Sequence, residues 1–253
     1  MLQDEIENIN HVLSNVENST VYLVVDGGSE DGSDRRLEQL NVNVLRNPFV
    51  GFADQRSFLQ RCAKERYGSE VSHLLFIDAD EDLRPDNILE INEAVTKDYD
   101  GLSFGFDFIY AGARVQYAYR HPVVQRLFRL DEFAGIDQGA REYFSKITTK
   151  KARHNIRHCD GKVGTRSELL KIRKNAIREA SWEISKTDTL VVRRFWVKMP
   201  LGFRSIIYFL FRYFLKFGFL DGRAGLNYLI MNVLIYRLLI DYEIHKQKTT
   251  ENT

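Results

Sequence analysis

One stretch of this sequence, residues 73–81, constrains the fold more than any other. It reads His73-Leu74-Leu75-Phe76-Ile77-Asp78-Ala79-Asp80-Glu81, a mostly apolar run that ends in two aspartates separated by one small residue. Buried strands of parallel sheets have such continuous apolar runs. Because ligands of open α/β sheets gather at the carboxyl ends of these strands, the two aspartates suit a hard divalent cation such as Mg²⁺ or Mn²⁺. Taken alone, the same pair also suits a solvated turn or a helix N-cap.

The elements around this run alternate between helix and strand. Apolar spacing predicts helices over Asp4–Val16 and Gly51–Tyr67, and a third helix that begins at Pro85. Short β-branched runs predict strands at Val21–Val25 and Val42–Leu45. This alternation is typical of an α/β fold in which helices cover a largely parallel sheet.

From Gly101 onward the pattern changes. Phenylalanines at alternate positions predict one antiparallel strand over Leu102–Tyr110, and Val123–Leu130 is a second candidate. Charged residues at helical spacing predict a helix over Ser167–Ser185. We therefore expect an α/β domain over residues 1–160 and a helical extension over residues 161–253.

Composition excludes several classes of protein. A length of 253 residues can bury a substantial core, and a net charge of +1 argues against a dedicated nucleic-acid binder. The two cysteines, Cys62 and Cys159, lack the spacing of a metal site and favour a reducing, cytoplasmic setting. The polar opening residues predict no secretory signal, and no apolar run reaches the roughly 18 residues that span a bilayer.

Four segments, in this order, resemble the signatures of family 2 glycosyltransferases of the GT-A type. Val24–Ser33 resembles the turn that follows a family strand, and Gly51–Phe58 resembles a glycine-then-arginine helix start. Phe76–Glu81 resembles the metal-binding LDADE motif. Phe217–Gly222 reads Phe-Gly-Phe-Leu-Asp-Gly and resembles the GFLDG of the branch with lipopolysaccharide-core and capsule enzymes.

The resemblance implies a GT-A-type, Rossmann-like mixed sheet flanked by helices, followed by a helical C-terminal extension. It also implies an inverting, metal-dependent enzyme that moves a hexose from a nucleotide sugar, UDP-linked by expectation, to a lipid-linked or cell-envelope saccharide. Family members usually open with a strand of the type ISVVIPTYNE, whereas this chain opens with Gln3-Asp4-Glu5-Ile6. We therefore expect the fold to be N-terminally truncated, with the strand either upstream of Met1 or lost from a decayed fragment.

The resemblance assigns the donor site to residues of the first three motifs. Asp26 would accept a hydrogen bond from the nucleotide base, although an aspartate that bonds its own turn is the structural alternative. Arg56 would reach the nucleotide or its phosphates, and a solvent-facing helix arginine is the alternative. Asp78 would line the ribose or metal side. Asp80 would bind the Mn²⁺ or Mg²⁺ that stabilises the departing diphosphate, with His158 as a second metal ligand or, alternatively, a core or capping histidine.

An inverting transferase also needs a carboxylate that takes the proton of the acceptor hydroxyl. Residues 136–144 resemble the acceptor-side VHE-type motif of the family, so Glu142 is the candidate base and Asp137 the second choice. Arg141 stands where that motif has histidine. The alternative is that these carboxylates form surface ion pairs with Arg141 or Lys146.

The segment between Asp188 and Asp221 contains no acidic residue. Its cations are interleaved with aromatic residues and are Arg193, Arg194, Lys198, Arg204, Arg212 and Lys216. This mixture predicts contact with an anionic membrane surface, which would make the protein peripheral at the inner face of the cell membrane. The alternatives are single-stranded nucleic acid or a packing helix with snorkelling cations. Asp221 is expected to cap the helix that continues through Leu226–Leu239.

Two further functions compete with the transferase. A non-catalytic remnant that binds membrane or a partner glycosyltransferase would explain the absent first strand. A phosphatase of the haloacid dehalogenase type would use Asp78 and Asp80 as nucleophile and acid. That class carries D-x-D-x-T on its first strand, whereas here two strands precede the motif and Asp82 replaces the threonine.

Overall fold

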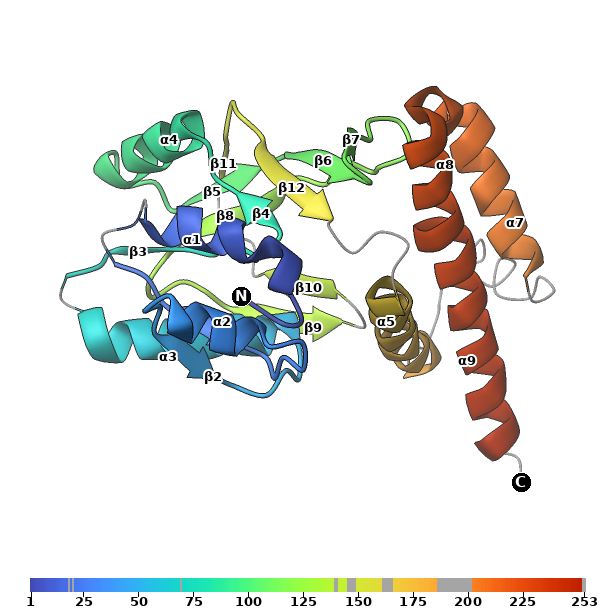
Figure 1. The fold of residues 1–253 in the computed structure, drawn as a ribbon, viewed down its shortest axis with the longest axis horizontal. Coiled ribbons are helices and arrows are strands. Elements are labelled where there is room, and N and C mark those ends of the chain that lie inside the picture. Colours follow the sequence, from blue (N-terminus) through green and yellow to red (C-terminus); the bar gives the residue numbers. More distant parts are fainter. Residues whose placement is uncertain are drawn as a thin grey trace. The chain divides into compact units, whose positions relative to one another are not determined.

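The computed structural model describes residues 1–17, 19, 21–68, 70–138, 141–144, 149–160, 166–185 and 202–251. The chain divides into two compact units (Figure 1). The sheet unit comprises residues 1–112, 121–137 and 142–161, and the helical unit comprises residues 113–120, 138–141 and 162–253.

In the first part of the sheet unit, helices and strands alternate as the sequence predicts. The order is a 3₁₀ turn Ile6–Asn8, α1 Ile9–Glu17, β1 Val24–Asp26, α2 Ser33–Gln39, β2 Val44–Arg46, α3 Phe52–Tyr67, β3 His73–Leu75, β4 Glu81–Asp82 and α4 Pro85–Thr96. Pro85 is the first residue of α4, where its missing N–H costs no hydrogen bond. The later strands are β5 Gly101–Phe104, β6 Phe106–Tyr110, β7 Ala113–Arg114, β8 Val124–Arg129, β9 Gly135–Gln138, β10 Arg141–Phe144, β11 Lys150–Lys151 and β12 Ile156–Asp160.

The strands form a mixed arrangement of parallel and antiparallel pairs. β1 pairs in parallel with β2, and β9 pairs with β10. A four-stranded sheet has the order β11-β5-β8-β3, in which β8 is antiparallel to both β5 and β3. A second has the order β4-β12-β6-β7, with β12 parallel to β6 and antiparallel to β4. The fold is therefore of the mixed α/β class, with helices flanking the sheets.

The prediction of one strand over Leu102–Tyr110 is wrong. The segment forms two strands, β5 and β6, which separate at Gly105 and join different four-stranded sheets. A Cβ atom at Gly105 would lie 2.6 Å from Oδ1 of Asn155, so the close approach of Asn155 requires glycine there. Phe106, Phe108 and Tyr110 are buried, as their alternation in the sequence predicts.

Met1 and Leu2 lie between β1 and the acidic turn that follows β3. The N–H of Leu2 donates to Val25 O at 3.0 Å, and the N–H of Gly27 donates to Leu2 O at 2.9 Å. On the other side, the Met1 ammonium donates to Ile77 O at 2.8 Å, and the N–H of Ala79 donates to Met1 O at 3.0 Å. Two residues thus join β1 to the end of β3 in the manner of a parallel strand.

A slot of about 280 Å³ opens beside these two residues. One wall is residues 21–24, which lead into β1, and the opposite wall is residues 73–78, which form and follow β3. Helices α1 and α3 contribute Val12, Val16, Leu59 and Ala63. The slot therefore lies between two strand segments that Met1 and Leu2 bridge only at their carboxyl ends.

The helical unit is built from seven described helices and helical turns. They are α5 Arg166–Ser185, α7 Phe203–Leu210, a π-helical turn Phe211–Leu215, a 3₁₀ turn Gly218–Asp221, α8 Gly222–Leu229, a second π-helical turn Ile230–Ile235 and α9 Tyr236–Glu251. The core between α5 and α9 contains Ala176, Ala180 and Ile240. Asp241, which is 1 % exposed, pairs with Arg204.

Asp221 does not cap the helix that follows it, contrary to the prediction. Its carboxylate accepts backbone N–H groups of three consecutive residues, Gln116 at 3.0 Å, Tyr117 at 2.7 Å and Ala118 at 2.6 Å. Arg212 donates to the carbonyl oxygen of Ala118. Both residues therefore hold the 116–118 segment, within the same unit.

Candidate active site

Two buried arginines organise the acidic edge of the sheet unit. Arg56 comes from the second turn of α3 and Arg126 from the middle of β8, and their exposed fractions are 1 % and 5 %. Arg56 packs over the ring of Phe76 and Arg126 over that of Phe106, at 5.2 and 5.5 Å from the ring centroids. Because such deeply buried cations are costly unless paired, the surrounding carboxylates are structural necessities.

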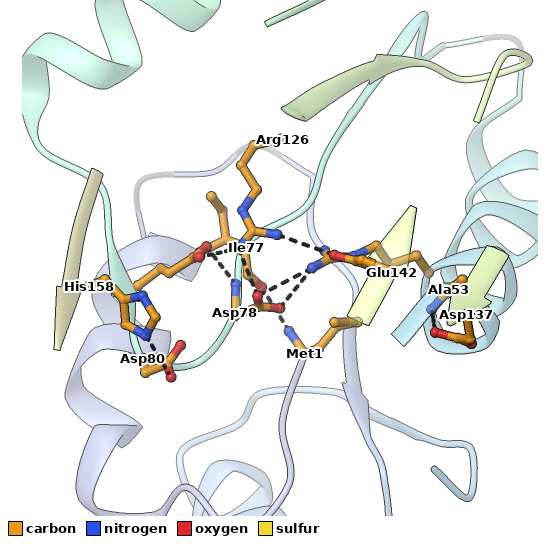
Figure 2. Close-up of polar contacts among 11 residues, drawn as sticks. Met1, Ala53, Ile77, Asp78, Asp80, Arg126, Asp137, Glu142 and His158 are labelled. Carbon is orange, nitrogen blue, oxygen red and sulfur yellow. Dashed lines mark hydrogen bonds and ion pairs between the residues drawn. The ribbon is translucent and has the colours of Figure 1, made fainter. Parts of the chain in front are cut away.

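Asp78 lies between the two guanidinium groups. Arg56 Nη2 is 3.2 Å from both Asp78 carboxylate oxygens, and Arg126 Nη2 is 2.9 Å from Oδ2. Burial opposes ionisation of Asp78, but Arg56 and Arg126 together outweigh it and lower the pKa of Asp78 to about 2. Asp78 is therefore a permanent anion in this cluster (Figure 2).

Glu81 and Glu142 complete the partners of the arginines. Glu81, which is fully buried, pairs with Arg126 and accepts the backbone N–H of Asp78 at 3.1 Å. Burial raises the pKa of Glu81, and Arg126 opposes that shift. Glu142 accepts the Nε–H of Arg56 at 2.7 Å and lies 3.8 Å from Nη1 of Arg126. Glu142, the predicted catalytic base, is thus held by the same two arginines as Asp78, which is predicted to bind the nucleotide-sugar donor.

Both arginines keep N–H groups that no protein group accepts. Within the part of the chain that the structure describes, Arg56 Nη1 and Arg126 Nε and Nη1 are buried and make no hydrogen bond. An unmade hydrogen bond of a buried donor costs about 1–3 kcal/mol. These donors give the cluster capacity to bind further anionic or carbonyl oxygens.

The predicted metal ligands Asp80 and His158 lie together, apart from the arginines (Figure 2). His158 Nε2 is 3.2 Å from Asp80 Oδ2. β12 pairs with β4 so that His158 faces Glu81, and this register brings the histidine to the acidic turn. The rings of Phe106 and Phe108 contact the imidazole edge-on at 5.6 and 5.2 Å and fix its orientation.

The donor set of this pair is compatible with a divalent cation. Two neighbouring ligands of an octahedral ion, with bonds of about 2.1 Å, lie about 3 Å apart, close to the Asp80–His158 separation. Among the described residues no group of three or more His, Cys, Asp or Glu side chains is arranged for a metal. A metal here would therefore take its remaining ligands from phosphate oxygens and water, as Mg²⁺ commonly does.

Asp26 and Asp137 have structural partners. The carboxylate of Asp26, which is 3 % exposed, accepts the N–H groups of Gly28 at 2.9 Å and Ser29 at 3.0 Å, as the alternative reading of its turn predicts. Asp137 accepts the N–H of Ala53 at 2.9 Å and so caps α3, the helix that carries Arg56. A hydrogen bond from the nucleotide base to Asp26 would have to use the remaining lone pairs of the Asp26 carboxylate.

Sequence reasoning missed Arg126. A signal was present, since Gln125 and Arg126 stand in the sequence between the apolar pairs Val123-Val124 and Leu127-Phe128, and the structure buries residues 125–128. A cation inside a buried strand requires carboxylate partners, and the acidic turn after β3 is the neighbouring source. Of the acceptor-side motif, Gly139 and Ala140 lie outside the described residues, as does the alternative partner Lys146.

Among three comparisons with known proteins, the family profile agrees with the resemblance in the sequence. No curated protein matches the chain. A solved structure entitled "Crystal structure of S. aureus TarS 1-349" aligns at 10 % identity with a TM-score of 0.45, over 100 % of this chain and 90 % of that one. The family profile described as "Glycosyl transferase family 2" matches residues 5–170, well over half of the chain and all of the acidic edge. This chain therefore belongs to glycosyl transferase family 2 and is a glycosyltransferase.

Proposed function

We propose that this glycosyltransferase moves a hexose from a UDP-type nucleotide sugar to a lipid-linked or cell-envelope saccharide, with inversion at the anomeric carbon. The observation that carries the proposal is the grouping of Arg56, Asp78, Arg126 and Glu142 beside the Asp80–His158 pair. A nucleotide-sugar transferase needs cations for a diphosphate and a carboxylate for the acceptor, and this edge contains both.

The arginines are suited to the diphosphate of the donor. Their Nη1 and Nε groups, which make no hydrogen bond among the described residues, can donate to phosphate oxygens without breaking the hydrogen bonds of Arg56 to Asp78 and Glu142. Planar guanidinium groups bind phosphate oxygens in pairs, and a pre-paired arginine loses little side-chain entropy on binding. Asp78, held as an anion, keeps both guanidinium groups in place.

Asp80 and His158 would hold Mn²⁺ or Mg²⁺. When bound, such an ion acts as a Lewis acid that stabilises the negative charge of the departing diphosphate. A metal with only two protein ligands would depend on the donor for tight binding. Metal and nucleotide are therefore expected to bind cooperatively.

Glu142 is the base in this proposal. As the acceptor oxygen attacks the anomeric carbon, its proton passes to Glu142, and the bond between that carbon and the diphosphate oxygen breaks with its electrons on the diphosphate. Arg56 holds the Glu142 carboxylate at 2.7 Å and so fixes its position. Asp137 is less suited to this role because it already accepts the N–H of Ala53.

The finer family assignment rests on two local features. Phe217–Gly222 supports the branch with lipopolysaccharide-core and capsule enzymes, and with it a peripheral, cytoplasmic location at the inner face of the cell membrane. The slot between residues 21–24 and 73–78 is compatible with a further strand, because a strand that ended at Met1 would pair with both walls.

Titration of UDP into the protein, with and without Mn²⁺, tests the proposal. We expect metal-dependent binding that is lost in Asp80→Ala and retained in Asp131→Ala, a control whose side chain is 86 % exposed. Glu142→Gln should bind UDP as the unmodified protein does but transfer no sugar. UDP binding that ignores both Mn²⁺ and Asp80→Ala would refute the metal assignment, and full transfer by Glu142→Gln would move the base elsewhere.

A further inference from the structure

The segment 203–220 of the helical unit, which we call the apolar edge, is unusually rich in exposed apolar side chains. It comprises α7, the π-helical turn after it and most of the 3₁₀ turn 218–221. Nine of its 18 residues are large apolar residues with exposed fractions of 38–67 %. The most exposed are Phe203, Phe214, Leu215, Phe217 and Leu220. Large apolar side chains exposed in such number within one segment point to an interaction site.

The cations of the apolar edge do not form a basic surface. Arg204 is 4 % exposed and pairs with Asp241, and Arg212 is 7 % exposed and donates to Ala118 O. Lys216 is exposed and lies 5.8 Å from the ring centroid of Phe211. Arg193, Arg194 and Lys198, the other predicted cations, lie outside the described residues. The described part of this surface is therefore apolar and aromatic rather than basic.

Phe217 has an unfavourable backbone conformation. Its φ is +58°, in the left-handed region that glycine and asparagine tolerate and bulky residues avoid. Its ring is also 53 % exposed, so the side chain gains little from burial. A residue that is strained and exposed at once points to a function for the ring, because folding alone would favour glycine or asparagine there.

Among the described residues, the later part of the C-terminal helices is held by packing and ion pairs. The continuous helical stretch Gly218–Gln247 is long and apolar enough to cross a membrane by length and composition. Its later part, however, packs Ile240 against α5 and carries the ion pairs of Asp241 and Arg237 with Arg204 and Glu183. Spanning a bilayer would strip these contacts, whereas the apolar side chains of the apolar edge are exposed among the described residues.

We infer that the apolar edge inserts into the interfacial region of a lipid bilayer, with Phe214, Leu215 and Phe217 as its main anchors. The absence of acidic residues in segment 203–220 and the position of Lys216 beside the ring of Phe211 favour a bilayer over a protein partner. This inference deepens the membrane location proposed above and replaces electrostatic attraction with apolar insertion. Binding is therefore expected on neutral as well as anionic lipid.

Flotation of the full chain with phosphatidylcholine vesicles tests the inference. We expect Leu215→Ser to weaken the partition about tenfold, as withdrawal of one large apolar side chain from lipid should. Leu89→Ser is the matched control, because Leu89 lies on α4 and is also 67 % exposed. Phe217→Asn should weaken the partition to a similar degree and yet raise the thermal midpoint, since asparagine tolerates its backbone conformation.

Three results would overturn the inference. They are binding only to anionic vesicles, equal partition of Leu215→Ser and Leu89→Ser, and bound protein that resists an alkaline carbonate wash, which would indicate a spanning helix. UDP titration of the same samples keeps the two proposals separate. A chain that binds vesicles but not UDP contradicts only the donor assignment, and a chain that binds UDP but no vesicle contradicts only the apolar edge.

Discussion

The Asp137 carboxylate accepts the backbone N–H of Ala53 at 2.9 Å and so caps α3 from 84 residues away in the sequence. A Cβ atom at Gly51 would lie 2.0 Å from Oδ2 of the same aspartate, so Gly51 gives Asp137 access to the helix end. The cap lies one turn before Arg56. Asp137 is therefore a positioning residue for the cluster.

Asp137→Ala should lower the free energy of unfolding by about 1 kcal/mol, the usual value of an N-cap. It should also weaken UDP binding, because Arg56 loses its fixed helix start, while Asp137→Asn should keep most of both properties. Urea unfolding and UDP titration measure the two effects. Transfer that is abolished in Asp137→Asn without loss of UDP affinity would contradict the positioning role and make Asp137 the base.

Arg126→Ala is expected to be among the most destabilising single changes in the sheet unit. It leaves the buried Glu81 without its cation and Asp78 with Arg56 alone, and a broken buried pair costs about 3–5 kcal/mol. Arg46→Ala is the matched control, since Arg46 also pairs with two carboxylates but is 56 % exposed, and should cost less than about 1 kcal/mol. Equal losses of the two variants in urea unfolding would contradict the buried cluster.

The sequence predicts the local elements of this fold well. Helix α3, predicted as Gly51–Tyr67, and α5, predicted as Ser167–Ser185, agree within one residue. Both are long and carry their spacing pattern within one segment. The predicted strand Leu102–Tyr110 fails because its two halves pair with different later strands, β5 with β8 and β6 with β12.

The site, too, contains residues that a local motif marks and residues that only the fold brings into place. The resemblance led to Asp78, Asp80 and His158, and the structure brings the last two to 3.2 Å. It did not lead to Arg126, because no motif marks a residue whose role comes from the side chains it faces across sheets. Pairing between segments is set by register and burial, which a single sequence leaves open.

Asp221→Ala should release segment 116–118, because three backbone N–H groups lose a charged acceptor. Hydrogen bonds to charged groups contribute about 1.5–3 kcal/mol each at most, and a substantial loss of stability follows. Asp221→Asn should release the segment less than Asp221→Ala does, since the asparagine amide keeps one acceptor oxygen. Hydrogen exchange at the three amides measures the release, and unchanged protection in Asp221→Ala would contradict the clamp.

Removal of divalent metal with EDTA should abolish transfer, and Mn²⁺ should restore it. His158→Asn should raise the Mn²⁺ concentration needed for half-maximal transfer, whereas His154→Asn should not, because His154 contacts Glu90 instead. Transfer that persists at full rate in EDTA would contradict the metal assignment for Asp80 and His158.

The slot between β1 and β3 leads to the last prediction. Five β-branched apolar residues fused directly before Met1 should enter the slot as a strand and pair with residues 21–24 and 73–77 on its two sides. Several new hydrogen bonds of about 1 kcal/mol each should raise the free energy of unfolding by at least about 2 kcal/mol. UDP affinity should rise with it, because the strand steadies the turn that carries Asp26 and the turn that carries Asp78.

The control is an extension of five prolines, which has no N–H group to donate to either strand. Both extensions replace the Met1 ammonium by an amide. Both therefore remove a buried amino group whose pKa is lowered by burial. Only the β-branched extension supplies N–H donors to the two flanking strands. Equal stabilisation by the two would mean that relief of the buried amino group, and not strand pairing, accounts for the gain.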